Sequence, residues 1–131
     1  MRALVVDDQP ANLVLGEAIL KKLGFNVVLA SGGIEACGLF QIGMFDIILT
    51  DYNMPDMNGA ELTTAIRKIE QVESRTPSMI VAVSAAPTDE VRQDLMLAGI
   101  DKFLPKPMRF ADMSGIIKAC IEKVTPHKVD T

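Results

Sequence analysis

The sequence predicts an α/β domain built on a doubly wound, parallel sheet of five strands. Strand-like apolar runs alternate with helix-like segments five times along the chain, which is typical of a sheet covered on both faces. The run at residues 45–50 is almost entirely apolar, as expected of a central parallel strand buried on both sides. Crossovers between such strands are right-handed in nearly all proteins, and we expect the same here.

The first strand and helix have clear sequence signals. An apolar run at residues 2–6 predicts the strand and ends at Asp7 and Asp8. Apolar residues then recur at helical spacing around Leu13 and Leu20. This helix is expected to stop at Gly24, because glycine is common just beyond a helix end.

The second and third strands are expected at residues 25–30 and 45–50. Between them, Ser31 is expected to cap a helix that runs to about Gly43, since serine side chains often bind the free N–H groups of a first turn. The helix after the third strand is expected at residues 59–70, where apolar side chains form one stripe.

The carboxyl-terminal part predicts two more strand–helix units. The fourth strand is expected at residues 79–83. Thr88 precedes two acidic residues and is expected to cap a helix that ends near Gly99. The fifth strand and helix are expected at residues 101–105 and 109–124.

Composition indicates one soluble domain. The chain has 131 residues, of which 49% are hydrophobic, so residues 1–124 are predicted to form the domain and 125–131 a tail or linker stump. A net charge of −4 argues against nucleic acid or an anionic membrane as partner. No apolar run suits a signal peptide or a membrane span, which favours a cytoplasmic location. Cys37 and Cys120 are expected to be reduced and structural.

Polar residues stand where four of the predicted strands end. Asp7 and Asp8 follow the first strand, and Asp51 follows the third. Ser84 and Lys106 follow the fourth and fifth. Each residue alone is more typical of a turn or a solvated surface. Together they predict one site, because ligands of open α/β sheets bind beyond the carboxyl ends of the strands.

The residue types at this edge indicate phosphoryl chemistry. Carboxylates held close together repel one another and require a cation, and an all-oxygen set suits Mg²⁺ better than zinc. Asp51 is the expected nucleophile, since aspartate can form an aspartyl-phosphate, whereas Asp7 and Asp8 are better placed to hold the metal. Lys106 and Ser84 would supply a mobile charge and a hydroxyl donor to the phosphoryl oxygens.

At these residues the chain resembles the receiver domain of two-component response regulators over about residues 2–124. The resemblance implies a flavodoxin-like fold with strand order 2-1-3-4-5. It rests on motifs that occur in the family's order and at its approximate spacing: Val5-Val6-Asp7-Asp8, Asp51-Tyr52-Asn53-Met54-Pro55-Asp56-Met57-Asn58-Gly59, Val83-Ser84-Ala85 and Lys106-Pro107.

The resemblance also implies residue roles. Asp51 would accept a phosphoryl group from a histidine of a sensor histidine kinase or a histidine phosphotransfer protein. Asp8 would bind Mg²⁺ directly, Asp7 mainly through water, and Asn53 through its backbone carbonyl. Ser84 and Lys106 would hold the phosphoryl oxygens, and such a domain signals and assists its own phosphorylation and autodephosphorylation without being an enzyme in the usual sense.

A switch and an output surface follow from the same resemblance. Phe103 matches the aromatic residue that turns inward when Ser84 moves toward the phosphoryl group. The surface formed by residues 89–98, 101–105 and 109–124 would then change its affinity for a downstream protein or output domain. The Lys106–Pro107 bond is often cis in the family. The segment after Asp8 is similar to receivers of hybrid sensor kinases, with a stand-alone regulator as the alternative.

Two other functions remain open at the level of sequence. A degenerate receiver could act as a phosphorylation-independent binding module, although all five site residues are present. A Mg²⁺-dependent phosphatase with an aspartyl intermediate is disfavoured, because such enzymes carry a second aspartate where this chain has Asn53. Labelling with a small phosphodonor would separate these readings.

Overall fold

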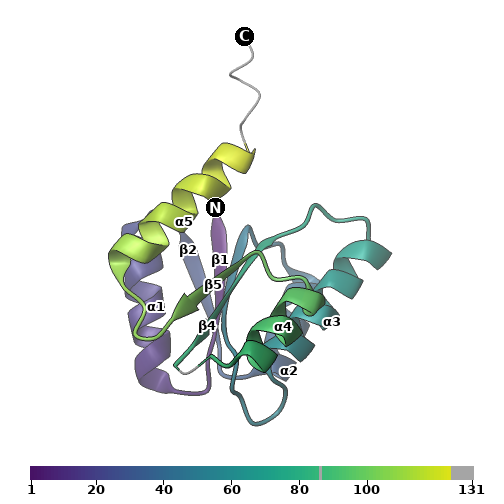
Figure 1. Ribbon diagram of the computed structural model, residues 1–131. Coiled ribbons are helices and arrows are strands. Elements are labelled where there is room, and N and C mark those ends of the chain that lie inside the picture. The colour runs from purple at the N-terminus through teal and green to yellow at the C-terminus, as the bar shows by residue number, and fades with distance from the viewer. Residues whose placement is uncertain (86, 125–131) are drawn as a thin grey trace.

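The computed structural model describes residues 1–85 and 87–124, with side chains up to residue 119. The predicted tail, residues 125–131, lies outside the described residues. Five strands alternate with five helices within the described part (Figure 1). In chain order they are β1 Arg2–Val6, α1 Pro10–Lys22, β2 Asn26–Ala30, α2 Gly33–Ile42, β3 Ile47–Asp51, α3 Gly59–Val72, β4 Met79–Ser84, α4 Asp89–Ala98, β5 Lys102–Pro105 and α5 Phe110–Val124.

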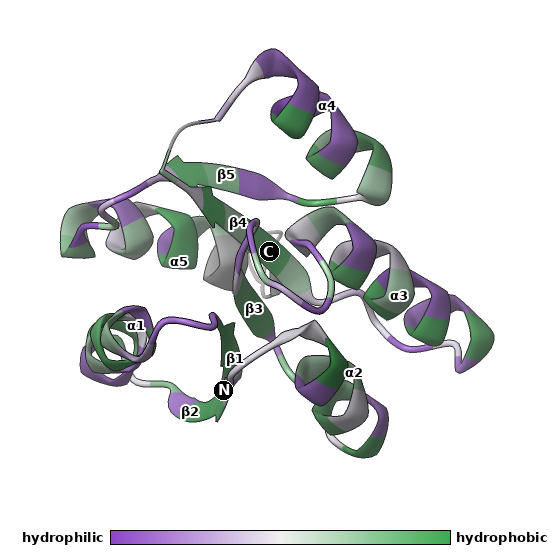
Figure 2. Cartoon of the chain, turned by 90° about the horizontal axis from the view of Figure 1, so that it is seen from below, coloured by the Kyte–Doolittle hydropathy of each residue, from purple (hydrophilic) through white to green (hydrophobic). Residues whose placement is uncertain are grey.

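The five strands form one parallel sheet in the order β2-β1-β3-β4-β5, which confirms the predicted fold class. Helices α1 and α5 cover one face, and α2, α3 and α4 cover the other (Figure 2). Successive side chains of a strand point to opposite faces, so Leu4 packs into one core cluster and Val5 into the other. The central strand β3 is buried along its whole length.

Most helix ends follow the sequence signals. At the end of α1, Gly24 has a φ of +96°, and the N–H groups of Gly24 and Phe25 bind the carbonyls of Lys21 and Leu20. This pattern is the Schellman motif, which satisfies carbonyls that have no partner in the helix. At the start of α4, Thr88 Oγ1 accepts a hydrogen bond from Val91 N–H at 3.1 Å, which confirms the predicted cap.

The predicted cap at Ser31 is wrong. Helix α2 begins at Gly33, and the hydroxyl of Ser31 donates instead to Glu35 Oε1 at 3.0 Å. The free N–H groups of Gly33 and Ile34 donate to the carboxylate of Asp56, which lies far along the chain. Because this carboxylate already occupies the first turn, the helix has no need of a local cap.

The other end of α2 is closed by an arginine from the loop before β4. The guanidinium of Arg75 donates to the carbonyls of Phe40, Gln41 and Gly43, at 2.6, 2.9 and 3.2 Å. A cation at a helix carboxyl end and a carboxylate at the amino end both oppose the helix dipole. Helix α2 is therefore held by charged residues from two distant loops.

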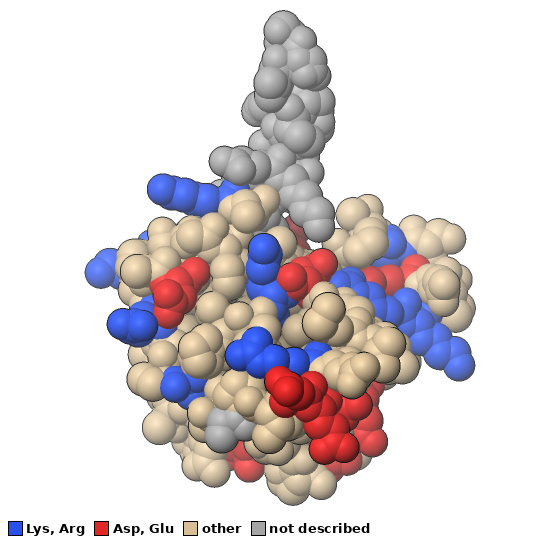
Figure 3. All heavy atoms as spheres, in the orientation of Figure 1, with Lys and Arg blue, Asp and Glu red and all other residues tan. Residues whose placement is uncertain are grey.

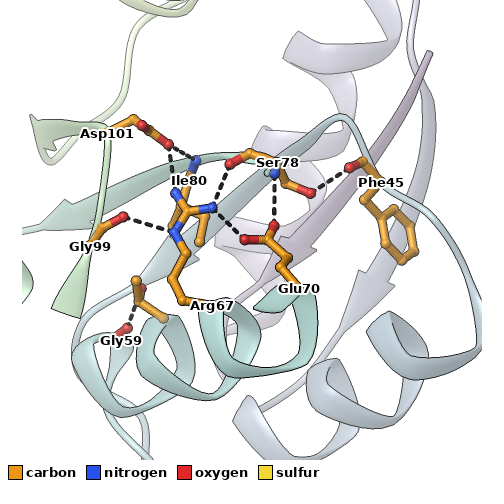
Figure 4. A network of polar contacts seen from close by, with 9 residues as sticks. Phe45, Gly59, Arg67, Glu70, Ser78, Ile80, Gly99 and Asp101 are labelled. Carbon is orange, nitrogen blue, oxygen red and sulfur yellow. Dashed lines mark hydrogen bonds and ion pairs between the residues drawn. The ribbon is translucent and has the colours of Figure 1, made fainter. Parts of the chain in front are cut away.

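A second arginine joins α3 to the starts of β4 and β5 (Figure 4). Arg67 donates to the carboxylates of Glu70 and Asp101 and to the carbonyls of Ser78 and Gly99. The carboxylate of Glu70 also accepts the N–H of Ser78, just before β4, and that of Asp101 accepts the N–H of Ile80 in β4. This network lies at the end of the sheet opposite the polar edge predicted from sequence.

Candidate functional site

The carboxyl edge of the sheet brings the predicted site residues together. Asp51 is the last residue of β3 and pairs in register with Val83, the neighbour of Ser84. Ser84 ends β4 and pairs with Pro105, the neighbour of Lys106. Asp7 directly follows β1, whose last residue pairs with Thr50. Parallel pairing therefore aligns residues that are far apart in sequence.

A lysine connects the two buried carboxylates of this edge. Lys106 Nζ lies 3.1 Å from Asp51 Oδ1 and 3.7 Å from Asp7 Oδ2. Asp51 and Asp7 are 6% and 5% exposed, so water screens this charge cluster weakly. Asp7 Oδ1 also accepts the backbone N–H of Gln9 at 2.9 Å, which fixes its orientation. The carboxylate oxygens are thus pre-positioned.

The acidic residues fit a divalent cation. One ligand atom from each of Asp7, Asp8 and Asp51 lies within 4.8 Å of the others. Three carboxylates face a single ammonium group within the described contacts, so a bound cation would complete the charge balance. All three offer oxygen, the donor that Mg²⁺ prefers. Asp8 and Asn53 also line one open hollow of about 510 Å³.

Asp51, the predicted acceptor, has a perturbed pKa. Burial raises the pKa of Asp51 above its ordinary value of 3.8; the hydrogen bond from Lys106 opposes this, and the charge of Asp7 adds to it. Without a cation, the ionised form of Asp51 is therefore costly in the folded state. The same residue becomes easier to ionise when positive charge is added nearby.

We expect Asp51→Asn to stabilise the metal-free protein at neutral pH by roughly 1 kcal/mol, because it removes a buried charge from beside Asp7. The folded protein holds the Asp51 proton to a higher pH than the unfolded chain does. Wild type therefore loses stability as pH rises between 3.8 and the raised pKa. The difference in the free energy of unfolding between Asp51→Asn and wild type widens over this range. Urea unfolding across this range checks the prediction; a gap that does not depend on pH would contradict it.

A second, more enclosed cavity of about 360 Å³ adjoins the site between α1 and the loop before α5. Asp7, Asp51 and Lys106 also line this cavity. The walls are mainly apolar and come from Val5, Val6, Leu15, Leu49, Val83, Pro107 and Met108.

Of the two predicted switch residues, Ser84 lies at this edge, whereas Phe103 lies within β5 and pairs in register with Ala82. Ser84 is 2% exposed, and its carbonyl accepts the N–H of Lys106 at 3.0 Å. Phe103 is half-buried, with the guanidinium of Arg92 stacked 4.7 Å from its ring centre. The Lys106–Pro107 peptide bond is cis, as the resemblance implied.

Sequence reasoning missed two contacts near Asp51. Tyr52 follows Asp51, and its hydroxyl donates to Asp94 of α4 at 3.4 Å. Burial and then the charge of Asp94 raise the pKa of Tyr52. Asp56 binds the first turn of α2, and backbone N–H groups, chiefly that of Ile34, hold its pKa below the usual range. Both contacts join distant segments, so no local signal reveals them.

Comparison with known proteins agrees with this geometry. The 2-1-3-4-5 sheet places the chain among the flavodoxin-like α/β proteins. The profile of the response regulator receiver domain matches residues 3–118. The chain belongs to this family of two-component signalling domains.

Three similar proteins show where such domains occur. The chain is 35% identical to Sensor protein GacS of Pseudomonas syringae over 88% of this chain but only 13% of that protein. The receiver domain of the histidine kinase CKI1 from Arabidopsis thaliana, solved with Mg²⁺, is 32% identical with a TM-score of 0.82, covering 90% of each chain. The receiver domain of Saccharomyces cerevisiae Ssk1, solved with the phosphotransfer protein Ypd1, is 26% identical with a TM-score of 0.79, covering 87% and 83%.

One further observation concerns membranes. Within the described part of the chain, no helix is both long and apolar enough to cross a bilayer.

Proposed function

We propose that this receiver domain accepts a phosphoryl group on Asp51 from a phosphohistidine of a partner protein, with Mg²⁺ as cofactor. The observation that carries the proposal is the buried Asp51 carboxylate beside Asp7, with the Lys106 ammonium 3.1 Å away. This arrangement supplies a nucleophile and a cation at one point. Charge stabilisation and positioning account for most of the catalysis in phosphoryl transfer.

The residues divide into metal-holding and phosphoryl-holding groups. Asp8 would bind Mg²⁺ directly, Asp7 mainly through water, and Asn53 through its backbone carbonyl. When bound, the ion neutralises charge on the carboxylates and on the phosphoryl oxygens. Lys106 and Ser84 would hold the remaining phosphoryl oxygens from the other side of the site. The Mg²⁺ complex of the similar CKI1 receiver supports Mg²⁺ as the cofactor.

The proposed reaction is one displacement at phosphorus. A carboxylate oxygen of Asp51 forms the new O–P bond while the N–P bond to the donor imidazole breaks. The electron pair of the broken bond stays on the imidazole nitrogen, and no proton needs to leave Asp51. Autodephosphorylation would be the attack of water on the same phosphorus, which returns Asp51 to a carboxylate and releases phosphate.

The proposed donor is a sensor histidine kinase, a histidine phosphotransfer protein, or both. The similarity to GacS and to the receiver solved with Ypd1 supports these two classes. Exposed apolar side chains of α1, Val14 and Leu15, lie on the helix that borders the enclosed cavity beside Asp51. Such a surface suits protein contact close to the acceptor. Attachment to a hybrid sensor kinase, residues 125–131 as tail or linker, and a cytoplasmic location stay predictions.

The test is labelling with a small phosphodonor that contains an N–P bond, such as phosphoramidate. Wild type is expected to gain the mass of one phosphoryl group when Mg²⁺ is present, and to lose this gain with a chelator. Asp51→Asn should stay unlabelled, whereas Asp89→Asn, which removes an exposed carboxylate from α4, should label normally. A folded wild-type protein that is never labelled would favour the phosphorylation-independent binding module.

The proposed output surface comprises α4, β5 and α5. Acidic side chains gather over α4 in Figure 3, where Asp89, Glu90 and Asp94 are exposed. Phosphorylation would draw Ser84 and Lys106 toward the phosphoryl group, and Phe103 would change rotamer. A modification shifts such an equilibrium only through its different interaction with the two states.

We expect Ser84→Ala to be labelled yet to lose most of the phosphorylation-dependent change on this surface. The reason is that its hydroxyl donor to the phosphoryl group is missing. Amide hydrogen exchange of residues 89–105, compared with and without phosphorylation, measures the change. Ser114→Ala on α5 is the control. An unaltered response in Ser84→Ala would rule out this coupling route.

A further inference from the structure

The loop between β3 and α3 is tied to helix α2. Asp56 Oδ1 accepts the N–H of Gly33 at 3.1 Å, and Oδ2 accepts that of Ile34 at 2.9 Å. First-turn N–H groups have no partner within their own helix, and the positive end of the helix dipole favours a carboxylate. The contact spans more than twenty positions of the chain. It therefore fixes the loop against another part of the fold.

Close packing supports the same attachment. A Cβ atom on Gly32 would lie 2.8 Å from Asp56 Oδ2, and one on Gly33 would lie 2.5 Å from Met57 Cγ. Two glycines thus allow the loop to rest directly on the backbone of α2. Neither position needs the left-handed backbone region, so the close approach accounts for them.

The rest of the loop is anchored on either side of Asp56. Met54 is 8% exposed and packs into the core cluster beneath α2 and α3. At the base, Gly59 N–H donates to the carbonyl of Tyr52 at 2.8 Å. Asn53 lies between the base and these anchors. These contacts hold the loop on both sides of Asn53.

We propose that Asp56 is a positioning residue for the cation site, which it acts on by holding the Asn53 carbonyl toward the side occupied by Asp8. This inference rests on the proposed function, because it assumes that the cation is held by this carbonyl. Because the loop is already fixed, cation binding does not have to include the entropic cost of ordering the loop. Residues that orient metal ligands typically change metal affinity about 10–100-fold when they are replaced.

The first measurement is a Mg²⁺ titration of Asp56→Ala, read by the fluorescence of Tyr52. The chain has one tyrosine and no tryptophan, and this tyrosine follows the acceptor directly. Asp56→Ala is expected to weaken Mg²⁺ binding about tenfold. Its labelling rate should recover to near wild type at saturating Mg²⁺, since no phosphoryl-holding group is altered. Asp56→Asn keeps one acceptor oxygen, so its Mg²⁺ affinity should lie between those of Asp56→Ala and wild type.

Two further variants separate positioning from general stability. Gly33→Ala pushes against Met57 without removing a charge and should also weaken Mg²⁺ binding. Glu35→Ala removes a carboxylate from the same helix end, but Glu35 binds only Ser31 among the described contacts, so Mg²⁺ affinity should be unchanged. In metal-free protein, amide exchange of residues 53–58 should be faster than wild type in Asp56→Ala. In Glu35→Ala it should equal that of wild type.

The outcomes are distinct. Unchanged Mg²⁺ affinity in Asp56→Ala, even with a lower urea midpoint, would overturn the positioning role and leave Asp56 as a structural contact. A wild-type protein that binds Mg²⁺ but is never labelled on Asp51 would instead overturn the proposed function.

Discussion

Replacing Lys106 with methionine is expected to slow labelling of Asp51 by phosphoramidate about 100-fold at saturating Mg²⁺. Lys106 is the cation nearest to Asp51 in the described structure, with its ammonium 3.1 Å from the carboxylate. Loss of one pre-positioned donor to developing negative charge typically costs a factor of about 10²–10³ in rate. Methionine keeps much of the length of the side chain, so the change isolates the charge.

Lys102→Met provides the matched control. Lys102 is the exposed first residue of β5, whereas Lys106 directly follows the last residue of that strand. This variant should be labelled at the wild-type rate. Equal labelling rates for Lys106→Met and wild type would show that Lys106 does not hold the phosphoryl group.

Replacing Arg67 with methionine is expected to lower the free energy of unfolding by about 3 kcal/mol, because it leaves the buried Glu70 carboxylate without its cation. Arg67 also binds two carbonyls and Asp101, which would lose donors. The expected loss of stability lies at the low end of the range for breaking a buried ion pair. The reason is that Arg67 and Asp101 are 23% and 27% exposed, so water partly screens their charges.

Urea unfolding of Arg67→Met and of Lys68→Met checks this expectation. Lys68 is the next residue of α3 and is exposed, so its replacement should change stability by less than about 0.5 kcal/mol. Equal stability of the two variants would mean that the network in Figure 4 contributes little. Labelling of Asp51 should survive in Arg67→Met wherever the protein is folded, because the network lies at the opposite end of the sheet.

The sheet and its polar edge could be predicted because their signals are local. An apolar run ends at Asp51, another ends at Ser84, and parallel pairing brings such ends to one edge. Helix boundaries with glycine or threonine signals were also predictable, as at Gly24, Gly99 and Thr88. Asn58 and Glu61 form a capping box at the start of α3. Their three-residue spacing is a known sequence signal for such a box, but it was not among the predicted features.

Contacts between distant loops could not be predicted from the sequence alone. Nothing near Asp56 indicates that it binds α2, and the error at Ser31 follows directly, because the local cap was preferred over a distant one. The same holds for Arg67 and Arg75, whose partners lie on other elements. The contact of Tyr52 with Asp94 also depends on how α4 packs beside α3.

That last contact suggests how the site and α4 are connected in the resting protein. Tyr52 and Phe103 both pack against the core cluster that contains Leu95, and the hydroxyl of Tyr52 donates to Asp94. The residue next to Asp51, the proposed acceptor, therefore contacts α4, the first helix of the proposed output surface.

The central claim is that Asp51 is the phosphoryl acceptor. Tandem mass spectrometry of wild-type protein, treated with phosphoramidate and Mg²⁺ and digested at acidic pH, tests it most directly. The account predicts one modified peptide, with the phosphoryl group on Asp51. A phosphoryl group found on any other residue, or an unmodified Asp51 in folded, Mg²⁺-bound protein, would contradict it.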